Sequence, residues 1–218
     1  MRKRGFIFDL DGVIVDTAKY HFLAWKKLAN SIGVDFSEAQ NEQLKGISRV
    51  NSLKKILTWG NKTISEKEFS DLMTSKNEDY LIHVQTMDEA EILPDVSKIL
   101  DFLITEKQPI ALGSASKNAR LILKKVNLIA HFDAIVDGTN VSKAKPDPEV
   151  FLIAAKQIEM APEACIVFED SVAGIQAANA ANMISVGIGN AKILDEADYV
   201  FNDFTEISTR FLKEIKKK

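Results

Sequence analysis

Near its start, the chain has a short apolar run that ends abruptly in acidic residues. Residues 6–8 are Phe-Ile-Phe, and Asp9, Leu10 and Asp11 follow them. A short, continuous apolar run of this kind is consistent with a buried strand. Because side chains alternate between the two faces of a strand, Asp9 and Asp11 should point the same way while Leu10 points back. The pattern predicts two carboxylates side by side at the end of a buried strand.

Two neighbouring carboxylates need a compensating charge. At a separation of about 4 Å and an effective dielectric constant of ~20, they repel each other by roughly 4 kcal/mol. A shared proton, or a hard divalent cation with oxygen ligands such as Mg²⁺, would offset this repulsion. One carboxylate can then act as a nucleophile and its neighbour as a general acid/base.

Two simpler explanations of the acidic pair fit less well. A calcium-binding loop needs a third oxygen ligand and a closing glutamate, at positions where this chain has Val13 and Tyr20. An ordinary turn explains Asp11 and Gly12, because both residue types favour turns, but it leaves Asp9 unexplained.

The composition limits the class of protein. The 218 residues suit one large domain or a domain with an insertion, and 46% of them are hydrophobic, enough for a real core. A net charge of −3 gives no strong attraction to nucleic acid or membrane, and no apolar run approaches the length of a membrane span. The single cysteine, Cys165, excludes an internal disulfide. We expect a cytoplasmic monomer without a signal peptide and without nucleic-acid or membrane partners.

Short apolar runs alternate with helical patterns along most of the chain. The expected strands are residues 5–8, 109–112, 134–136, 166–168, 184–188 and 199–201. Between them, apolar residues recur at helical spacing, as at Val96, Ile99, Leu100 and Leu103. Continuous apolar strands indicate a sheet covered on both faces. The alternation predicts an α/β fold with a doubly wound, Rossmann-like parallel sheet, whose sites lie at the carboxyl ends of its strands.

One interval, residues 18–88, contains helical stripes and no convincing strand. Its stripes are Phe22, Trp25, Ala29 and Ile32; Val50, Leu53 and Leu57; and Phe69, Leu72, Met73, Lys76 and Tyr80. We interpret it as an inserted helical bundle with Trp25 and Tyr80 as core anchors. Residues 1–16 and 89–218 would then form the α/β core, and residues 17–88 a cap domain. A bundle joined to the core by two neighbouring segments is suited to act as a hinged lid.

The residues that follow four of the strands suit phosphate chemistry. They are Asp9 and Asp11, the segment 114–118, Lys145 before Pro146, and Glu169, Asp170 and Ser171. Hydroxyl and backbone N–H groups at a helix start can bind phosphate. Pro146 disfavours a helical conformation of Lys145, so the next helix should begin after it. Ser171 is placed to cap a helix over 172–181. Each segment is a weak signal alone, but their joint appearance predicts one convergent site.

These segments resemble the four motifs of the haloacid dehalogenase superfamily: residues 8–13, Ser114, Lys145-Pro146 and Glu169-Asp170-Ser171. The resemblance spans the chain, and the insertion after the first motif is similar to the helical cap of one class of that superfamily. The resemblance implies that Asp9 becomes an aspartyl-phosphate, that Asp11 is the general acid/base, and that Ser114 and Lys145 stabilise the transferred phosphoryl group. It also implies Mg²⁺, held by Asp9, the Asp11 main-chain carbonyl, Glu169 and Asp170.

Other segments resemble the sugar-phosphate mutases of this superfamily: residues 11–18, 20–21, Trp25, 41–46, 48–49, 76–77 and 114–118. This implies an isomerase that interconverts β-D-glucose 1-phosphate and glucose 6-phosphate, with glucose 1,6-bisphosphate as intermediate and activator. The implied substrate-binding residues are Thr17, His21, Trp25, Lys45, Gly46, Arg49, Ser52, Lys76, Ala115, Ser116, Lys117 and Asn118. Gly113 departs from the pattern, which has a residue such as alanine there, and we expect it to loosen the strand end slightly. Beyond Ser171 the likeness is only in outline.

A mutase needs a second anion site, because its bisphosphate intermediate binds in two orientations. Arg49 offers a bidentate guanidinium for this role, although most arginines are surface residues. His21 and Lys76 either orient the sugar and couple cap closure to Asp11, or are an interfacial histidine and a surface lysine. The rival functions are a sugar-phosphate or phosphoglycolate phosphatase on the same fold, and a phospho-accepting signalling receiver. The receiver would lack the helical insertion.

Overall fold

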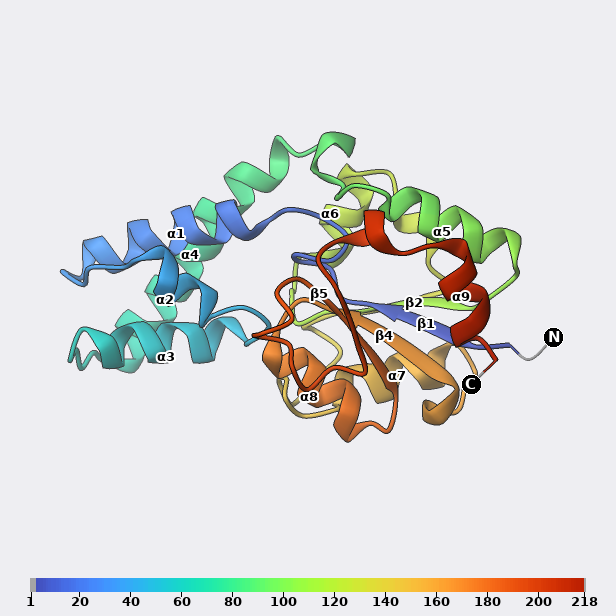
Figure 1. The fold of residues 1–218 in the computed structure, drawn as a ribbon. Helices are drawn as coiled ribbons and strands as arrows, with labels where there is room; N and C mark the ends of the chain where they lie inside the picture. The colour runs from blue at the N-terminus through green and yellow to red at the C-terminus, as the bar shows by residue number, and fades with distance from the viewer. Residues whose placement is uncertain (1–2, 218) are drawn as a thin grey trace.

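The computed structural model describes residues 3–217, which form an α/β core and a helical cap at one side of it (Figure 1). The sheet contains β1 (Gly5–Phe8), β2 (Ile110–Gly113), β3 (Ala134–Val136), β4 (Cys165–Glu169), β5 (Ile184–Ile188) and β6 (Tyr199–Phe201). Neighbouring strands are all parallel, in the order β3-β2-β1-β4-β5-β6. The predicted doubly wound sheet is confirmed.

Helices cover both faces of the sheet. One face carries α5 (Val96–Thr105), α6 (Ala119–Lys125) and α9 (Thr209–Ile215), and the other carries α7 (Glu149–Gln157) and α8 (Val172–Ala180). The strands divide their side chains between these layers, as alternation requires. Phe6 and Phe8 pack with α5 and α6, whereas Ile7 packs with α7. The expected starts of two helices are also confirmed: α7 begins after Pro146, and the Ser171 hydroxyl caps α8 by accepting from Gly174 N.

The cap consists of α1 (Ala18–Ser31), α2 (Glu38–Glu42), α3 (Arg49–Trp59) and α4 (Glu66–Gln85). No strand lies within it among the described residues. It has an apolar cluster of its own, in which Trp25 packs with α3 as expected. Tyr80, by contrast, belongs to the core cluster, because the end of α4 reaches back to the core. The cap therefore shares part of its packing with the domain it covers.

The two segments that join cap and core lie against each other. Val15 and Ile92 form an antiparallel bridge, and Asp16 N donates to Glu91 O at 2.9 Å. The Tyr20 hydroxyl donates to the Glu91 carboxylate at 2.5 Å. The chain thus leaves and re-enters the core at one place.

Gly113 does not loosen the end of β2, contrary to our expectation. A Cβ added there would lie 2.8 Å from Phe151 Cδ1 and 3.2 Å from Ile7 Cγ2. The phenylalanine ring of α7 occupies the space that a larger residue would take. A glycine is therefore required by the close approach of a helix to this strand.

Candidate active site

The acidic residues of the first and fourth motifs meet at the point in the sheet where the strand order reverses. Strands β1 and β4 are neighbours, although the connections from them run to opposite sides. Phe8 pairs with Phe168, and Asp9 N donates to Phe168 O at 3.0 Å. Such a reversal opens a crevice at the carboxyl ends of the strands. Asp9 and Glu169 thus lie side by side at its base.

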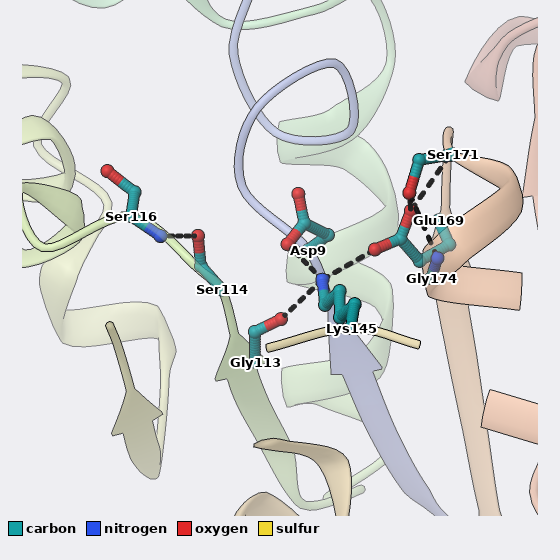
Figure 2. Close-up of polar contacts among 8 residues, drawn as sticks. All are labelled: Asp9, Gly113, Ser114, Ser116, Lys145, Glu169, Ser171 and Gly174. Carbon is teal, nitrogen blue, oxygen red and sulfur yellow. Dashed lines mark hydrogen bonds and ion pairs between the residues drawn. The ribbon is translucent and has the colours of Figure 1, made fainter. Parts of the chain in front are cut away.

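Lys145 lies between these two carboxylates (Figure 2). Its Nζ is 2.6 Å from Asp9 Oδ1 and 2.5 Å from Glu169 Oε1, and it also donates to Gly113 O at 3.2 Å. The ammonium is buried, and burial alone would lower its pKa. The charges of Asp9 and Glu169 outweigh burial and raise the pKa of Lys145. Lys145 is therefore a fixed positive charge beside the carboxylate that we predict to be the nucleophile.

Negative charge still exceeds positive charge in this crevice. Burial raises the pKa of Asp9 to about 7; Lys145 acts against this, and Glu169 and Asp11 add to it. Burial and the charges of Glu169, Asp9 and Asp11 raise the pKa of Asp170 well above its ordinary value. A divalent cation would stabilise the ionised forms, so the chemistry of this donor set fits one.

The local backbone also fits a cation site. Gly12 has a φ of +80°, and a Cβ there would lie 2.2 Å from Asp170 Oδ2. The glycine lets the Asp170 carboxylate approach the loop that carries Asp9 and Asp11. Within residues 3–217, however, no three His, Cys, Asp or Glu side chains are already arranged around one metal position.

Glu169 has partners for both of its oxygens. Oε1 accepts from Lys145, while Oε2 accepts from Ser171 N at 2.9 Å and from the Ser171 hydroxyl at 2.8 Å. A Cβ at Gly174 would lie 1.9 Å from the Glu169 carboxyl carbon, so this glycine makes room for the carboxylate. A metal would have to use the remaining lone pairs of Glu169. The predicted metal ligands Asp9 and Asp170 make fewer hydrogen bonds and ion pairs with other residues than Glu169 does.

The loop after β2 places hydroxyl groups opposite Lys145. Ser114 is buried, and its hydroxyl accepts from Ser116 N at 3.1 Å (Figure 2). The Ser116 hydroxyl in turn accepts from Asn118 N at 3.3 Å. Asn118 reaches the cap, where its amide donates to the Asn77 amide oxygen at 3.0 Å. The loop therefore runs from the base of the crevice to the cap.

A chain of polar side chains connects Asp11 to the interior of the cap. Asp11 accepts from the Thr17 hydroxyl, and its Oδ1 lies 3.7 Å from His21 Nε2. On its other side, His21 Nδ1 lies 2.9 Å from Lys76 Nζ. Burial acts to raise the pKa of Asp11, but His21, Thr17 and Lys76 together hold it below its ordinary value. Asp11 is therefore an ionised carboxylate that can accept a proton.

The cap contributes a group of cations with few anions. Lys76 is only 2% exposed and lies 4.6 Å from the centre of the Trp25 ring. Burial and the positive charge of Arg49 lower the pKa of Lys76 to about 7. The guanidinium of Arg49 makes no hydrogen bond or ion pair with any other described residue, and burial lowers its pKa. This cationic region is suited to bind an anion.

Replacing Lys76 with methionine should stabilise the fold near neutral pH. The pKa of Lys76 falls from 10.5 to about 7 on folding, so between these values the unfolded chain binds a proton that the native chain lacks. Stability from this group therefore rises with pH from about 7 to 10.5, and the full penalty acts below pH 7. We expect Lys76→Met to raise the free energy of unfolding by roughly 1–3 kcal/mol at pH 6–7, with little difference near pH 10.

Urea unfolding of both proteins from pH 6 to pH 10 measures this effect. Lys67→Met, at an exposed position of the same helix, is the control and should change stability by less than about 0.5 kcal/mol. A Lys76→Met protein that is less stable than the wild type at pH 6 would show that the ammonium is favourably buried.

A cavity of about 500 Å³ lies between cap and core. Most of the predicted site residues line it: Asp9, Asp11, His21, Trp25, Lys45, Gly46, Arg49, Ser52, Ser114, Ala115, Ser116, Lys117, Asn118, Lys145 and Asp170. Thr17, Lys76 and Glu169 do not line the cavity, but each makes a hydrogen bond with a residue that does. The structure brings the predicted residues together around one cavity.

Sequence reasoning missed some of the lining. Asn41 is 8% exposed, and its side-chain amide makes no hydrogen bond with another described residue. Gly138 also lines the cavity, from the loop after β3. Asn41 lies in a segment that supported the family resemblance, which was the available signal for it. Gly138 carried no such signal.

The cap lies close against the core at the mouth of the cavity. Gly46 has a φ of +71°, and a Cβ there would lie 2.2 Å from the Ser171 hydroxyl. Lys45 Nζ is 2.9 Å from Glu42 Oε2 in the cap and 3.7 Å from Asp170 Oδ2 in the core. Glycine is needed at this point of contact, because any side chain would hold the two domains apart.

Comparisons with known proteins agree with this architecture. The profile of the haloacid dehalogenase-like hydrolases matches residues 3–182. The chain is 42% identical to β-phosphoglucomutase of Bacillus subtilis over 215 residues, which cover 97% of this chain and 94% of that protein. The solved structure of β-phosphoglucomutase from Clostridium difficile superposes with a TM-score of 0.95 at 41% identity, covering 99% and 97% of the two chains.

A phosphatase is among the relatives as well. Fructose-1-phosphate phosphatase of Escherichia coli is 29% identical over 187 residues, which cover 86% of this chain and 97% of that protein. Within residues 3–217, no helix combines the length and hydrophobicity needed to cross a membrane. The matches overturn the signalling-receiver alternative. The chain belongs to the haloacid dehalogenase-like hydrolase family and is an enzyme of its β-phosphoglucomutase group.

Proposed function

We propose that this enzyme interconverts β-D-glucose 1-phosphate and glucose 6-phosphate through an aspartyl-phosphate on Asp9 and a glucose 1,6-bisphosphate intermediate. The observation that carries this proposal is the pair of cationic regions on one cavity between cap and core. Lys145 lies beside Asp9 in the core, and Arg49 lies in the cap on the same cavity. A phosphatase needs only the first of these regions, whereas a bisphosphate needs both.

The proton transfers fall to Asp11. When a sugar hydroxyl attacks the phosphoryl group on Asp9, its proton would pass to the Asp11 carboxylate. In the opposite half-reaction, the protonated Asp11 would return that proton to the leaving sugar oxygen. The low pKa of Asp11 supports the first role, and Thr17 and His21 hold the carboxylate in place for both.

Charge on the transferred phosphoryl group would be stabilised by fixed donors. Lys145 supplies a permanent positive charge and the Ser114 hydroxyl a hydrogen bond at the base of the cavity. We propose Mg²⁺ as the cofactor, held by Asp9, the Asp11 main-chain carbonyl, Asp170 and Glu169. When bound, it would neutralise these carboxylates and the phosphoryl oxygens.

Closure of the cap supports transfer to sugar over transfer to water. The contacts of Gly46 with Ser171, of Lys45 with Asp170 and of Asn77 with Asn118 bring cap and core together. Closure of the cap on the core would exclude the water that would hydrolyse an aspartyl-phosphate. All of these groups come from one chain, so we infer an active monomer. The free buried thiol of Cys165 fits a cytoplasmic enzyme.

Product analysis tests the proposal. The protein is incubated with β-glucose 1-phosphate, Mg²⁺ and a trace of glucose 1,6-bisphosphate, and a parallel sample contains a chelator. Formation of glucose 6-phosphate that depends on Mg²⁺ supports the mutase. Release of free glucose and phosphate instead would favour the phosphatase alternative. The similarity to the phosphatase of Escherichia coli is the reason to test for it.

Arg49→Ala should separate transfer to sugar from hydrolysis. Loss of the guanidinium removes a bidentate, charge-assisted contact to the second phosphate, and such contacts contribute roughly 1.5–3 kcal/mol. We expect kcat/KM for β-glucose 1-phosphate to fall by about 10- to 150-fold. The slow hydrolysis of the phosphorylated enzyme in the absence of sugar should change little. Equal losses of both activities would contradict the assignment of Arg49 to the second phosphate.

A further inference from the structure

We propose that Asp137 and Gly138, in the loop after β3, are positioning residues for the second phosphate of the substrate. This inference rests on the proposed mutase function. The two residues would act through the segment 115–117, which lines the same cavity as Arg49 and which we propose to contact the second phosphate from the core side. Neither residue needs to touch the sugar.

Asp137 organises a tight turn. Asp137 is 3% exposed, and its carboxylate accepts from Thr139 N at 2.8 Å and from the Thr139 hydroxyl at 2.6 Å. Its backbone N donates to Asn140 Oδ1 at 3.0 Å. Arg120, at the start of α6, adds an ion pair of 3.2 Å from Nε to Asp137 Oδ2. The turn is therefore fixed by a buried charge with several partners.

Gly138 links the position of this turn to residues 115–117. Its N–H donates to Ser116 O at 3.2 Å. A Cβ at this position would lie 2.3 Å from the Ala115 carbonyl oxygen and 3.1 Å from Lys117 Cγ. The nearer obstacle is backbone, which cannot rotate away as a side chain can. Any side chain at position 138 must displace residues 115–117.

The base of the cavity is held separately. Ser114 N donates to Val136 O at 3.0 Å, as a continuation of the pairing between β2 and β3. Lys145 is anchored by both Asp9 and Glu169. The link between the two regions is the bond from Ser116 N to the Ser114 hydroxyl. A shift of residues 115–117 should therefore disturb the second phosphate more than the phosphoryl site at Asp9.

Gly138→Ala tests this division. Acetyl phosphate carries a single phosphoryl group and needs only the site at Asp9, whereas glucose 1,6-bisphosphate needs both sites. We expect the KM for glucose 1,6-bisphosphate to rise at least tenfold in Gly138→Ala. The rate at which acetyl phosphate phosphorylates the protein, followed by the mass of acid-quenched enzyme, should stay within twofold. Gly187→Ala, in β5, is the control for a closely packed glycine elsewhere in the core.

A milder variant allows the inference to be tested even if Gly138→Ala does not fold. Thr139→Val removes one hydroxyl donor from Asp137 at an exposed position and should raise the same KM two- to fivefold. Equal effects on both phosphoryl donors, or no effect on either, would overturn the inference. If the wild type forms no glucose 6-phosphate, the proposed function is wrong, which is a different result from an unchanged KM in an active mutase.

Discussion

Asp9→Asn is expected to abolish both turnover and the covalent attachment of phosphate to the protein. The amide cannot attack phosphorus, and removal of a catalytic nucleophile reduces kcat by a factor on the order of 10⁴ or more. The fold should survive. The pKa of Asp9 near 7 means that a neutral group is tolerated in this position, and asparagine is neutral and of the same shape. Mutase assays, with the mass of acid-quenched protein, measure both losses.

Asp195→Asn is the matched control, since Asp195 is an exposed carboxylate of the core. It should keep wild-type rates and the phosphorylated species. Retention of more than a hundredth of the activity in Asp9→Asn would contradict the assignment of the nucleophile, and so would phosphate trapped on another residue.

Lys145→Met should destabilise the protein strongly. The buried ammonium pairs with Asp9 and Glu169 at 2.6 and 2.5 Å, and its loss leaves two carboxylates facing each other. Removing one partner of a buried ion pair costs about 3–5 kcal/mol. For a chain of this length, the Tm should fall by roughly 10 °C. Activity should fall as well, because Lys145 is also the fixed charge beside the nucleophile.

Two further variants identify the cause of this effect. Lys143→Met removes a lysine two positions earlier, whose side chain is 68% exposed and pairs with Asp147 at 3.3 Å. Its stability should change by less than about 1 kcal/mol. Glu169→Gln added to Lys145→Met should restore part of the lost stability, since one uncompensated charge disappears. A double variant that is no more stable than Lys145→Met would mean that packing, and not charge, is responsible.

Strand positions could be predicted from the sequence because buried parallel strands are short and continuously apolar. β1, β3, β5 and β6 agree with their predicted ranges. The bounds of β2 and β4 differ from their predicted ranges by one residue at each end, because pairing with neighbours decides where a ladder begins and stops. Helix α2 was not predicted. It has only five residues and depends on the capping box of Ser37 and Gln40, which gives little periodicity.

The site residues could be predicted where they belong to short sequence motifs. The position of Lys76 was undecided, although it fell within an apolar stripe of its helix, and the structure buries it beside His21. The pairing of Lys145 with both Asp9 and Glu169 joins residues far apart in the chain, so no local pattern contains it. Asp137 and Gly138 were missed because the ion pair of Asp137 with Arg120 and the close approach of Gly138 to Ala115 depend on which segments lie next to them in the fold.

The pairing of Val15 with Ile92 has a consequence for how such enzymes diversify. An insert whose two ends emerge at adjoining backbone positions can be exchanged without shifting the register of any strand. Selection can therefore remodel the recognition of new metabolites in one module while the reaction centre beneath it stays intact. Transplanting the segment between these two residues into a related scaffold offers a direct route to altered substrate preference.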